Sequence, residues 1–217
     1  MKKRFLFTGT LVSLLILAVT VTALAAPAPS AVRRFADASI VSGSSASLVR
    51  ADDNVAMTLQ TTELDPGATY TMWWVVFNNP EYCIAGTPFS TCGEGDIFET
   101  DENGNLILDD DGNPILQVNE DDGTFGTPEV NVSVVFATGH VVGEDGAGNF
   151  GAGLREGKTS GALFGPGLAD AQGAEIHLIV RTHGEPIPGM VNKQISTVDG
   201  GCGINTCVDQ QFAVFVP

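Results

Sequence analysis

The sequence predicts an all-β sandwich, and three observations support this fold class. No stretch reads as a long amphipathic helix; short runs rich in β-branched and aromatic residues are each followed by Gly, Pro, Asp or Asn. Several runs alternate apolar and polar side chains with the period of two that a half-buried strand requires. The runs also recur at the spacing typical of sandwiches and barrels. We expect strands within residues 45–50, 54–64, 69–78, 105–108, 114–118, 130–142, 149–154, 174–182 and 210–216.

Residues 1–25 read as a secretion signal of bacterial type. The basic start "KKR" (2–4) precedes an apolar run over 5–24, and "ALA" (23–25) gives the small-residue pattern found before a cleavage site. The alternative is an uncleaved membrane anchor, since the apolar run approaches the length that spans a bilayer. Cleavage after Ala25 is favoured because the "APAPS" that follows is typical of an exposed mature N-terminus. We therefore expect a secreted, extracytoplasmic protein.

The charge balance narrows the choice of partners. Without residues 1–25 the chain keeps 7 basic and 26 acidic residues, a formal charge of −19. Such a chain repels nucleic acid and anionic lipid, and after signal cleavage no other apolar run is long enough to span a membrane. The remaining length suits a flexible mature N-terminus over 26–43 and one sandwich domain over 44–217. The oligomeric state stays open.

The four cysteines predict two disulfides, because an exported chain with an even cysteine count usually oxidises them. Three connectivities exist for Cys83, Cys92, Cys202 and Cys207. We favour Cys83–Cys92 and Cys202–Cys207, since each pair closes a short loop rich in turn residues. A metal site is the rival interpretation, but the intervals of eight and four residues do not match a zinc pattern.

The segment "ELDPGATY" (63–70) joins two expected strands and resembles the tyrosine corner of fibronectin type III and immunoglobulin-like sandwiches. The resemblance implies an immunoglobulin-like antiparallel sandwich and transfers no function. In such a corner the Tyr ring packs at the core edge and its hydroxyl bonds to the backbone just upstream. If Tyr70 faces the core, alternation places two sets of side chains on opposite faces. The inward set is Met72, Trp74 and Val76, and the outward set is Thr71, Trp73, Val75 and Phe77.

Three outward residues, Trp73, Val75 and Phe77, form the candidate ligand-binding stripe. Leaving a tryptophan bare is costly, because its burial removes roughly 150–250 Å² from water. Three alternatives remain for what covers this stripe: the acidic insertion over 94–129, a partner protein surface, or a glycan that stacks on the ring. We favour the insertion. The whole stripe lies on a run that is apolar on both faces, which marks a central strand.

The mature chain also resembles a group of uncharacterised secreted bacterial β-sandwich proteins. The resemblance rests on "WWVVFNNPEYC", "CGEGD", "GAEIHLIVRTHG" and "QISTVDGGC". It implies secretion and gives no function to carry over. The acidic stretch over 94–129 looks like an insertion relative to this group.

The insertion over 94–129 holds 12 of the 26 acidic residues and no Lys or Arg. Its segment "ETDENGNLILDD" (99–110) places oxygen ligands as a calcium-binding EF-hand loop does, at Glu99, Asp101, Asn103 and Asp110. The first and last positions carry the wrong acids, however, and the flanks read as a β-hairpin rather than an exiting helix. A solvated acidic hairpin is therefore preferred. The alternative is a looser calcium site built from Asp109, Asp110, Asp111 or Asp121 and Asp122.

The three histidines, His140, His177 and His183, offer a runner-up metal site. The last two lie six residues apart on one strand, roughly 20 Å if it is extended, so they cannot share an ion there. The closely spaced ligands of copper–zinc superoxide dismutase are absent, and surface histidines are the preferred interpretation. No nucleophile motif is present either. We expect a non-catalytic protein with an extracellular binding, adhesion or structural role; the alternative is a secreted metal-dependent enzyme.

Overall fold

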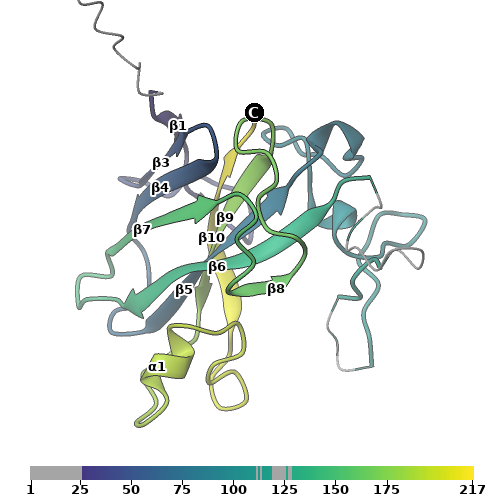
Figure 1. Cartoon of the computed structure of the whole chain (residues 1–217). Helices are drawn as coiled ribbons and strands as arrows, with labels where there is room; N and C mark the ends of the chain where they lie inside the picture. Colours follow the sequence, from purple (N-terminus) through teal and green to yellow (C-terminus); the bar gives the residue numbers. More distant parts are fainter. Residues whose placement is uncertain (1–25, 111, 113, 119–125, 127–128) are drawn as a thin grey trace, which may run out of the picture.

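Two antiparallel sheets pack face to face in the computed structural model, which describes residues 26–110, 112, 114–118, 126 and 129–217 (Figure 1). The smaller sheet has the order β1 (Ala28–Ser30), β3 (Ser45–Arg50), β4 (Asn54–Thr61), β7 (Gly148–Arg155). The larger sheet has the order β2 (Arg33–Arg34), β10 (Val208–Phe215), β9 (Glu175–Thr182), β5 (Thr69–Phe77), β6 (Val132–Val141), β8 (Ala162–Phe164). This confirms the all-β sandwich; immunoglobulin-like connectivity stays a prediction.

Seven of the expected strands are present, as β3, β4, β5, β6, β7, β9 and β10. The strands expected at 105–108 and 114–118 are wrong. The described residues there form isolated β-bridges, such as Leu108 with Pro114, and no named strand of the described chain pairs with them. The short strands β1, β2 and β8 were not expected from the sequence. The first two lie in the segment expected to be a flexible N-terminus.

The tyrosine corner forms as expected and sets the orientation of β5. The Tyr70 hydroxyl accepts a hydrogen bond from the backbone N–H of Asp65 at 2.9 Å and lies 2.9 Å from Oε1 of Gln210, to which it donates. Tyr70 and the alternate residues Met72, Trp74 and Val76 belong to the core between the sheets. The tryptophans therefore point to opposite faces, with Trp74 inside the sandwich.

β5 is the central strand of the larger sheet, paired with β9 on one side and β6 on the other. All nine of its residues are buried. The pairing with β6 has a bulge after Met72, so that Trp73 lies opposite Phe136, while the pairing with β9 is regular and places Ile179 beside Trp73. A strand buried on both faces needs a further layer over the outer face of its sheet.

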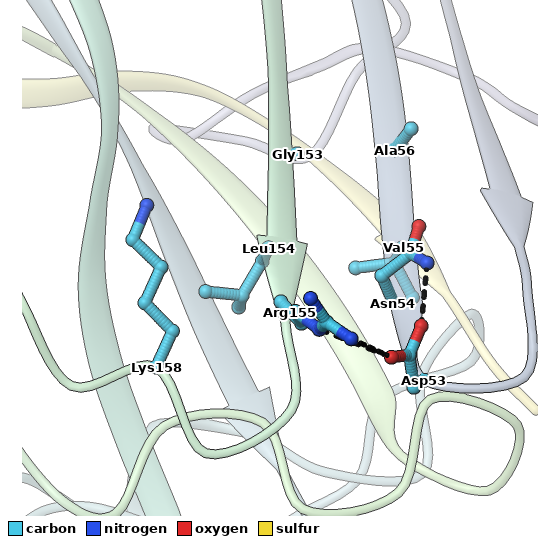
Figure 2. A pocket seen from close by; sticks show the side chains of 8 residues that line it. All are labelled: Asp53, Asn54, Val55, Ala56, Gly153, Leu154, Arg155 and Lys158. Atoms are coloured by element: carbon cyan, nitrogen blue, oxygen red, sulfur yellow. Dashed lines mark hydrogen bonds and ion pairs between the residues drawn. The ribbon is translucent and has the colours of Figure 1, made fainter.

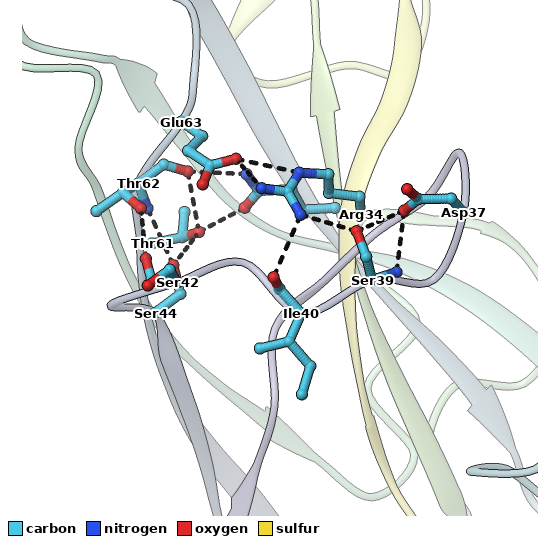
Figure 3. A network of polar contacts seen from close by, with 10 residues as sticks. Arg34, Asp37, Ser39, Ile40, Ser42, Ser44, Thr61, Thr62 and Glu63 are labelled. Atoms are coloured by element: carbon cyan, nitrogen blue, oxygen red, sulfur yellow. Dashed lines mark hydrogen bonds and ion pairs between the residues drawn. The ribbon is translucent and has the colours of Figure 1, made fainter.

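A polar network at one end of the sandwich ties the turn after β2 to the end of β4 (Figure 3). Arg34 forms an ion pair with Glu63 and donates to Oγ of Ser39 at 2.8 Å and to the carbonyl of Ile40 at 3.2 Å. Hydrogen bonds from the Ser39 hydroxyl and N–H hold the pKa of Asp37 below its ordinary value. These exposed contacts fix the turn geometry more than they add stability, since surface ion pairs contribute about 0–1 kcal/mol.

No helix among the described residues is long and apolar enough to cross a membrane. The helical content is limited to α1 (Val191–Gln194) and two short 3-10 turns, η1 (Pro80–Tyr82) and η2 (Glu94–Asp96), in the described part of the chain. The expected signal, residues 1–25, lies outside the described residues. Both expected disulfides are formed, Cys83–Cys92 and Cys202–Cys207, which is compatible with an oxidising compartment.

Candidate ligand-binding site

The stripe formed by Trp73, Val75 and Phe77 lies on the outer face of the larger sheet, as the corner motif predicts. Val75 and Phe77 belong to a second apolar cluster, with Cys92 and Ile97 among its buried members. The chain itself therefore covers this end of the stripe, with residues from inside and just before the acidic insertion. Trp73 is 4% exposed.

The first of two covers over this face comprises residues 79–98, and we call it the Cys83–Cys92 cover. Its shape depends on Asp96, whose carboxylate is fully buried. The carboxylate accepts backbone hydrogen bonds from Ile84 at 2.7 Å, Ala85 at 3.2 Å and Gly93 at 2.9 Å. A buried carboxylate needs such donors, because an unpaired charge away from water is strongly destabilising. In the sequence alone, nothing distinguishes Asp96 from the other acidic residues of the insertion.

Glu175 at the start of β9 fastens this cover to the sheet. It is fully buried, and it accepts hydrogen bonds from the backbone N–H of Thr91 at 3.0 Å and of Cys92 at 3.1 Å. Nε2 of His177, two residues along the same face, lies 2.7 Å from its carboxylate. Burial raises the pKa of Glu175, but the bonds from His177 and Cys92 outweigh burial and leave that pKa below its ordinary value.

The second cover comprises residues 184–207, including α1, and we call it the Cys202–Cys207 cover. It lies over a buried chain of hydrogen bonds that starts at the indole N–H of Trp73, which donates to Oγ1 of Thr71 at 2.9 Å. Oγ1 lies 2.8 Å from Nε2 of His183, whose Nδ1 lies 2.8 Å from the carbonyl of Gly200. Since a carbonyl only accepts, Nδ1 carries a proton. Burial lowers the pKa of His183 and so favours the neutral ring, in which Nε2 accepts from the Thr71 hydroxyl.

The expected surface position is therefore wrong for His183, which is fully buried. The loop after β9 folds back over the sheet and supplies a partner for each ring nitrogen, which removes the cost of burying the imidazole. Burial lowers the pKa of His183 and outweighs the opposing bond to Gly200. His177 is also mostly buried, with 12% of its side chain exposed.

Between the two covers lies a pocket of about 910 Å³. Its floor is the outer face of β5, β9 and β10, and its walls come mainly from the Cys83–Cys92 cover. The second cover contributes Val198, and the rest of the wall comes from β8, the turn after β2 and residues 100, 104 and 114 of the insertion. The lining includes seven Phe and Trp side chains: Phe35, Trp73, Phe77, Phe89, Phe98, Phe164 and Phe212. The ring of Phe212 packs against Phe35 at 5.8 Å and Phe89 at 5.7 Å between centroids. The pocket wall is thus largely apolar and aromatic.

Few charged groups line this pocket. Arg181 on β9 pairs with Asp209 on β10 at 2.8 Å and also donates to the carbonyl of Val198 at 3.2 Å. Glu94, at the start of η2, is solvent-exposed and has no hydrogen bond or ion pair to its carboxylate from any described residue. Partial burial of the carboxyl, and then the nearby charge of Asp209, raise the pKa of Glu94.

The calcium-loop residues Glu99, Asp101, Asn103 and Asp110 lie in an exposed turn. The Asp101 carboxylate is occupied by the turn itself, since it accepts backbone N–H groups of Asn103 at 2.8 Å and Asn105 at 2.9 Å. Within the described residues, no cluster of three metal-binding side chains includes any of these acids. Of the looser alternatives, Asp111, Asp121 and Asp122 lie outside the described residues. Calcium binding stays a prediction.

The three histidines have separate environments. His140 packs on Phe150 with ring centroids 4.5 Å apart, His177 contacts Glu175, and His183 lies under the second cover. Among described residues, no cluster of three metal-binding side chains contains two histidines, and both clusters that do occur include a disulfide-bonded pair of cysteines. The histidine metal site therefore gains no support from the geometry.

A second hollow of about 450 Å³ lies on the smaller sheet, between β4 and β7 (Figure 2). Arg155 and Asp53 form an ion pair there at 2.7 Å, and Lys158 lies at the edge. The hollow is open and shallow, and its principal charges already neutralise each other. The aromatic pocket is the stronger candidate site.

Compared with protein-family models, curated proteins and solved structures, the chain matches none.

Proposed function

We propose that the protein is a secreted, non-catalytic binding protein that holds a small, largely apolar ligand in the pocket between its two disulfide-bonded covers. The observation that carries this proposal is the pocket itself. Its volume of about 910 Å³ falls in the range of about 300–1,000 Å³ that small-molecule sites occupy. Such sites are lined mainly by apolar and aromatic groups with a few polar ones, which is also the composition of this wall.

The construction of the walls supports a preformed site. Asp96 and Glu175 each hold several backbone N–H groups of one cover, and a disulfide closes each cover. Fixing a site before the ligand arrives reduces the entropy lost on binding. Trp73, Val75 and Phe77, the residues expected to meet a ligand, form part of the floor. The nearly buried indole of Trp73 favours a ligand inserted into the pocket over a glycan stacked on an open ring.

Secretion belongs to the same proposal. The signal-like start of the sequence and the two disulfides support export to an oxidising compartment. The strongly acidic mature chain argues against nucleic acid as a partner.

A fluorescence titration tests the pocket. The neutral probe N-phenyl-1-naphthylamine should bind with one saturable site and gain emission on entering an apolar environment. Phe89→Ala removes one aromatic wall and should weaken binding of this probe about fivefold or more. Leu108→Ala, an exposed apolar residue outside the pocket lining, is the matched control and should leave the affinity unchanged. Circular dichroism and thermal unfolding establish that both variants fold.

Two results would refute the proposal. One is probe binding that does not saturate, and the other is a folded Phe89→Ala variant with the affinity of the control.

A further inference from the structure

The charged groups of the aromatic pocket leave one carboxylate unpaired. Three residues with formal charges line the pocket: Glu94, Arg181 and Asp209. Arg181 is already paired with Asp209. Glu94 has no ion-pair partner among the described residues, and it lies where the pocket meets solvent. Among the residues that line the pocket, Glu94 is therefore the one charged group without an ion-pair partner in the described part of the chain.

Three aromatic rings that line the same pocket present faces suited to a cation. Phe35, Phe89 and Phe212 form one group of rings, with Phe212 in contact with both others. The guanidinium of Arg33 already lies 4.5 Å from the centroid of Phe89. A cation over a ring face is attracted by the negative centre of the π system. Arg33 thus already occupies one face at Phe89, and the rings of Phe35 and Phe212 are the ones left to meet a ligand cation.

We propose that the pocket selects organic cations, meaning small molecules that carry an ammonium or similar group on an aromatic or aliphatic body. The inference rests on the proposed function and adds the class of ligand. The apolar body occupies the aromatic interior, and the cationic group lies at the mouth, between the Glu94 carboxylate and the ring faces. An anionic ligand of the same shape would meet Glu94 with like charge and is disfavoured.

The electrostatics at the mouth agree with this assignment. The raised pKa of Glu94 shows that partial burial and Asp209 disfavour its charged form when no cation is bound. A bound cation would stabilise that form. Affinity for a cation should therefore fall as the pH drops toward the pKa of Glu94, because protonation removes the attracting charge.

Three naphthalene probes of matched shape test the inference: 1-naphthylmethylamine is a cation at neutral pH, 1-naphthylmethanol is neutral, and 1-naphthylacetate is an anion. Binding is measured by fluorescence or calorimetry at neutral pH and 0.15 M salt, where charges beyond roughly 8 Å are largely screened. We expect the amine to bind about tenfold more tightly than the alcohol and the acetate to bind most weakly. Glu94→Gln should reduce the preference for the amine over the alcohol at least threefold.

Glu144→Gln is the matched control, because it makes the same change in net charge at an exposed position outside the pocket lining. The affinity for 1-naphthylmethanol should be the same in the wild type and both variants. Equal binding of amine and alcohol, or equal effects of Glu94→Gln and Glu144→Gln, would overturn the selection of cations while leaving the binding pocket intact. Absence of binding by all three probes and by N-phenyl-1-naphthylamine would instead overturn the proposed function.

Discussion

Replacing Glu175 by glutamine should destabilise the protein by about 3 kcal/mol. In the native structure its buried carboxylate accepts hydrogen bonds from two backbone N–H groups, those of Thr91 and Cys92, and contacts His177. Oε1 lies within 3.1 Å of both N–H groups and 2.7 Å from His177, while Oε2 accepts from Thr91 at 3.0 Å. Glutamine can keep the first oxygen, but its NH₂ group then replaces Oε2 and faces the Thr91 N–H, a donor against a donor. A buried N–H left without a partner costs about 1–3 kcal/mol, and loss of a charge-assisted bond to His177 adds about 1 kcal/mol.

Denaturant unfolding monitored by tryptophan emission measures this change, since both tryptophans lie on β5, the strand paired with β9. Glu185→Gln is the control, because Glu185 is exposed in the loop after β9 and its replacement should cost less than about 0.5 kcal/mol. A Glu175→Gln variant within about 0.5 kcal/mol of the control would show that Glu175 does not fasten the cover.

The pH dependence of the free energy of unfolding gives a second comparison, between the wild type and Glu175→Gln. The folded-state pKa of Glu175 lies below its ordinary value. The ionised carboxylate therefore contributes fully to stability above its unfolded-state pKa of about 4.3. That contribution is lost as the pH falls through the folded-state pKa. The wild type should therefore lose more stability than Glu175→Gln below about pH 4. Parallel pH curves would contradict the assignment.

Two further predictions concern the corner and the second cover. Tyr70→Phe should lower the free energy of unfolding by about 1–2 kcal/mol, because the bonds of the hydroxyl to Asp65 and Gln210 are lost; Tyr82→Phe, at a residue 53% exposed, should have no effect in the same denaturant assay. Stability should also fall as the pH drops below about 6.5, because unfolded histidines bind a proton there and the folded His183, with its lowered pKa, does not. This dependence should be smaller in His183→Gln, while the lowered pKa of His140 leaves part of it in place; an identical pH dependence in the variant would refute the role of His183.

The orientation of β5 could be predicted because its determinants are local. Strand side chains alternate strictly, so one anchored residue assigns all the others, and the corner motif anchors Tyr70. The assignment of Trp74 to the core and Trp73 to the outer face followed without knowledge of any distant contact. The bulge opposite Met72 lies in the pairing with β6 and does not interrupt the alternation along β5.

The covers could not be predicted because their contacts join residues far apart in the sequence. Glu175 and the N–H of Thr91 are separated by 84 positions, and neither residue carries a local sign of the other. Asp96 looked like one of many acids, although the short "CGEGD" segment places it next to the loop it organises. His183 looked exposed because alternation assigns a face and cannot show what lies over that face. Of the candidate site, the sequence therefore predicted the β5 residues of the floor but not the walls.

The two tryptophans also differ in whether their indole N–H groups have hydrogen-bond partners. This difference bears on the orientation of the proposed ligand in the pocket. The N–H of Trp73 donates to Thr71, so the polar atom of this ring is already paired within the protein. The buried N–H of Trp74 has no hydrogen-bond partner among the described residues, at a cost of about 1–3 kcal/mol that the core must offset. With its N–H paired, Trp73 offers carbon surface to the pocket floor, and a ligand gains nothing by placing a polar group there. Among the lining residues, Glu94 is the charged group without an ion-pair partner in the described part of the chain, so the proposed amphipathic cation should enter with its apolar end first.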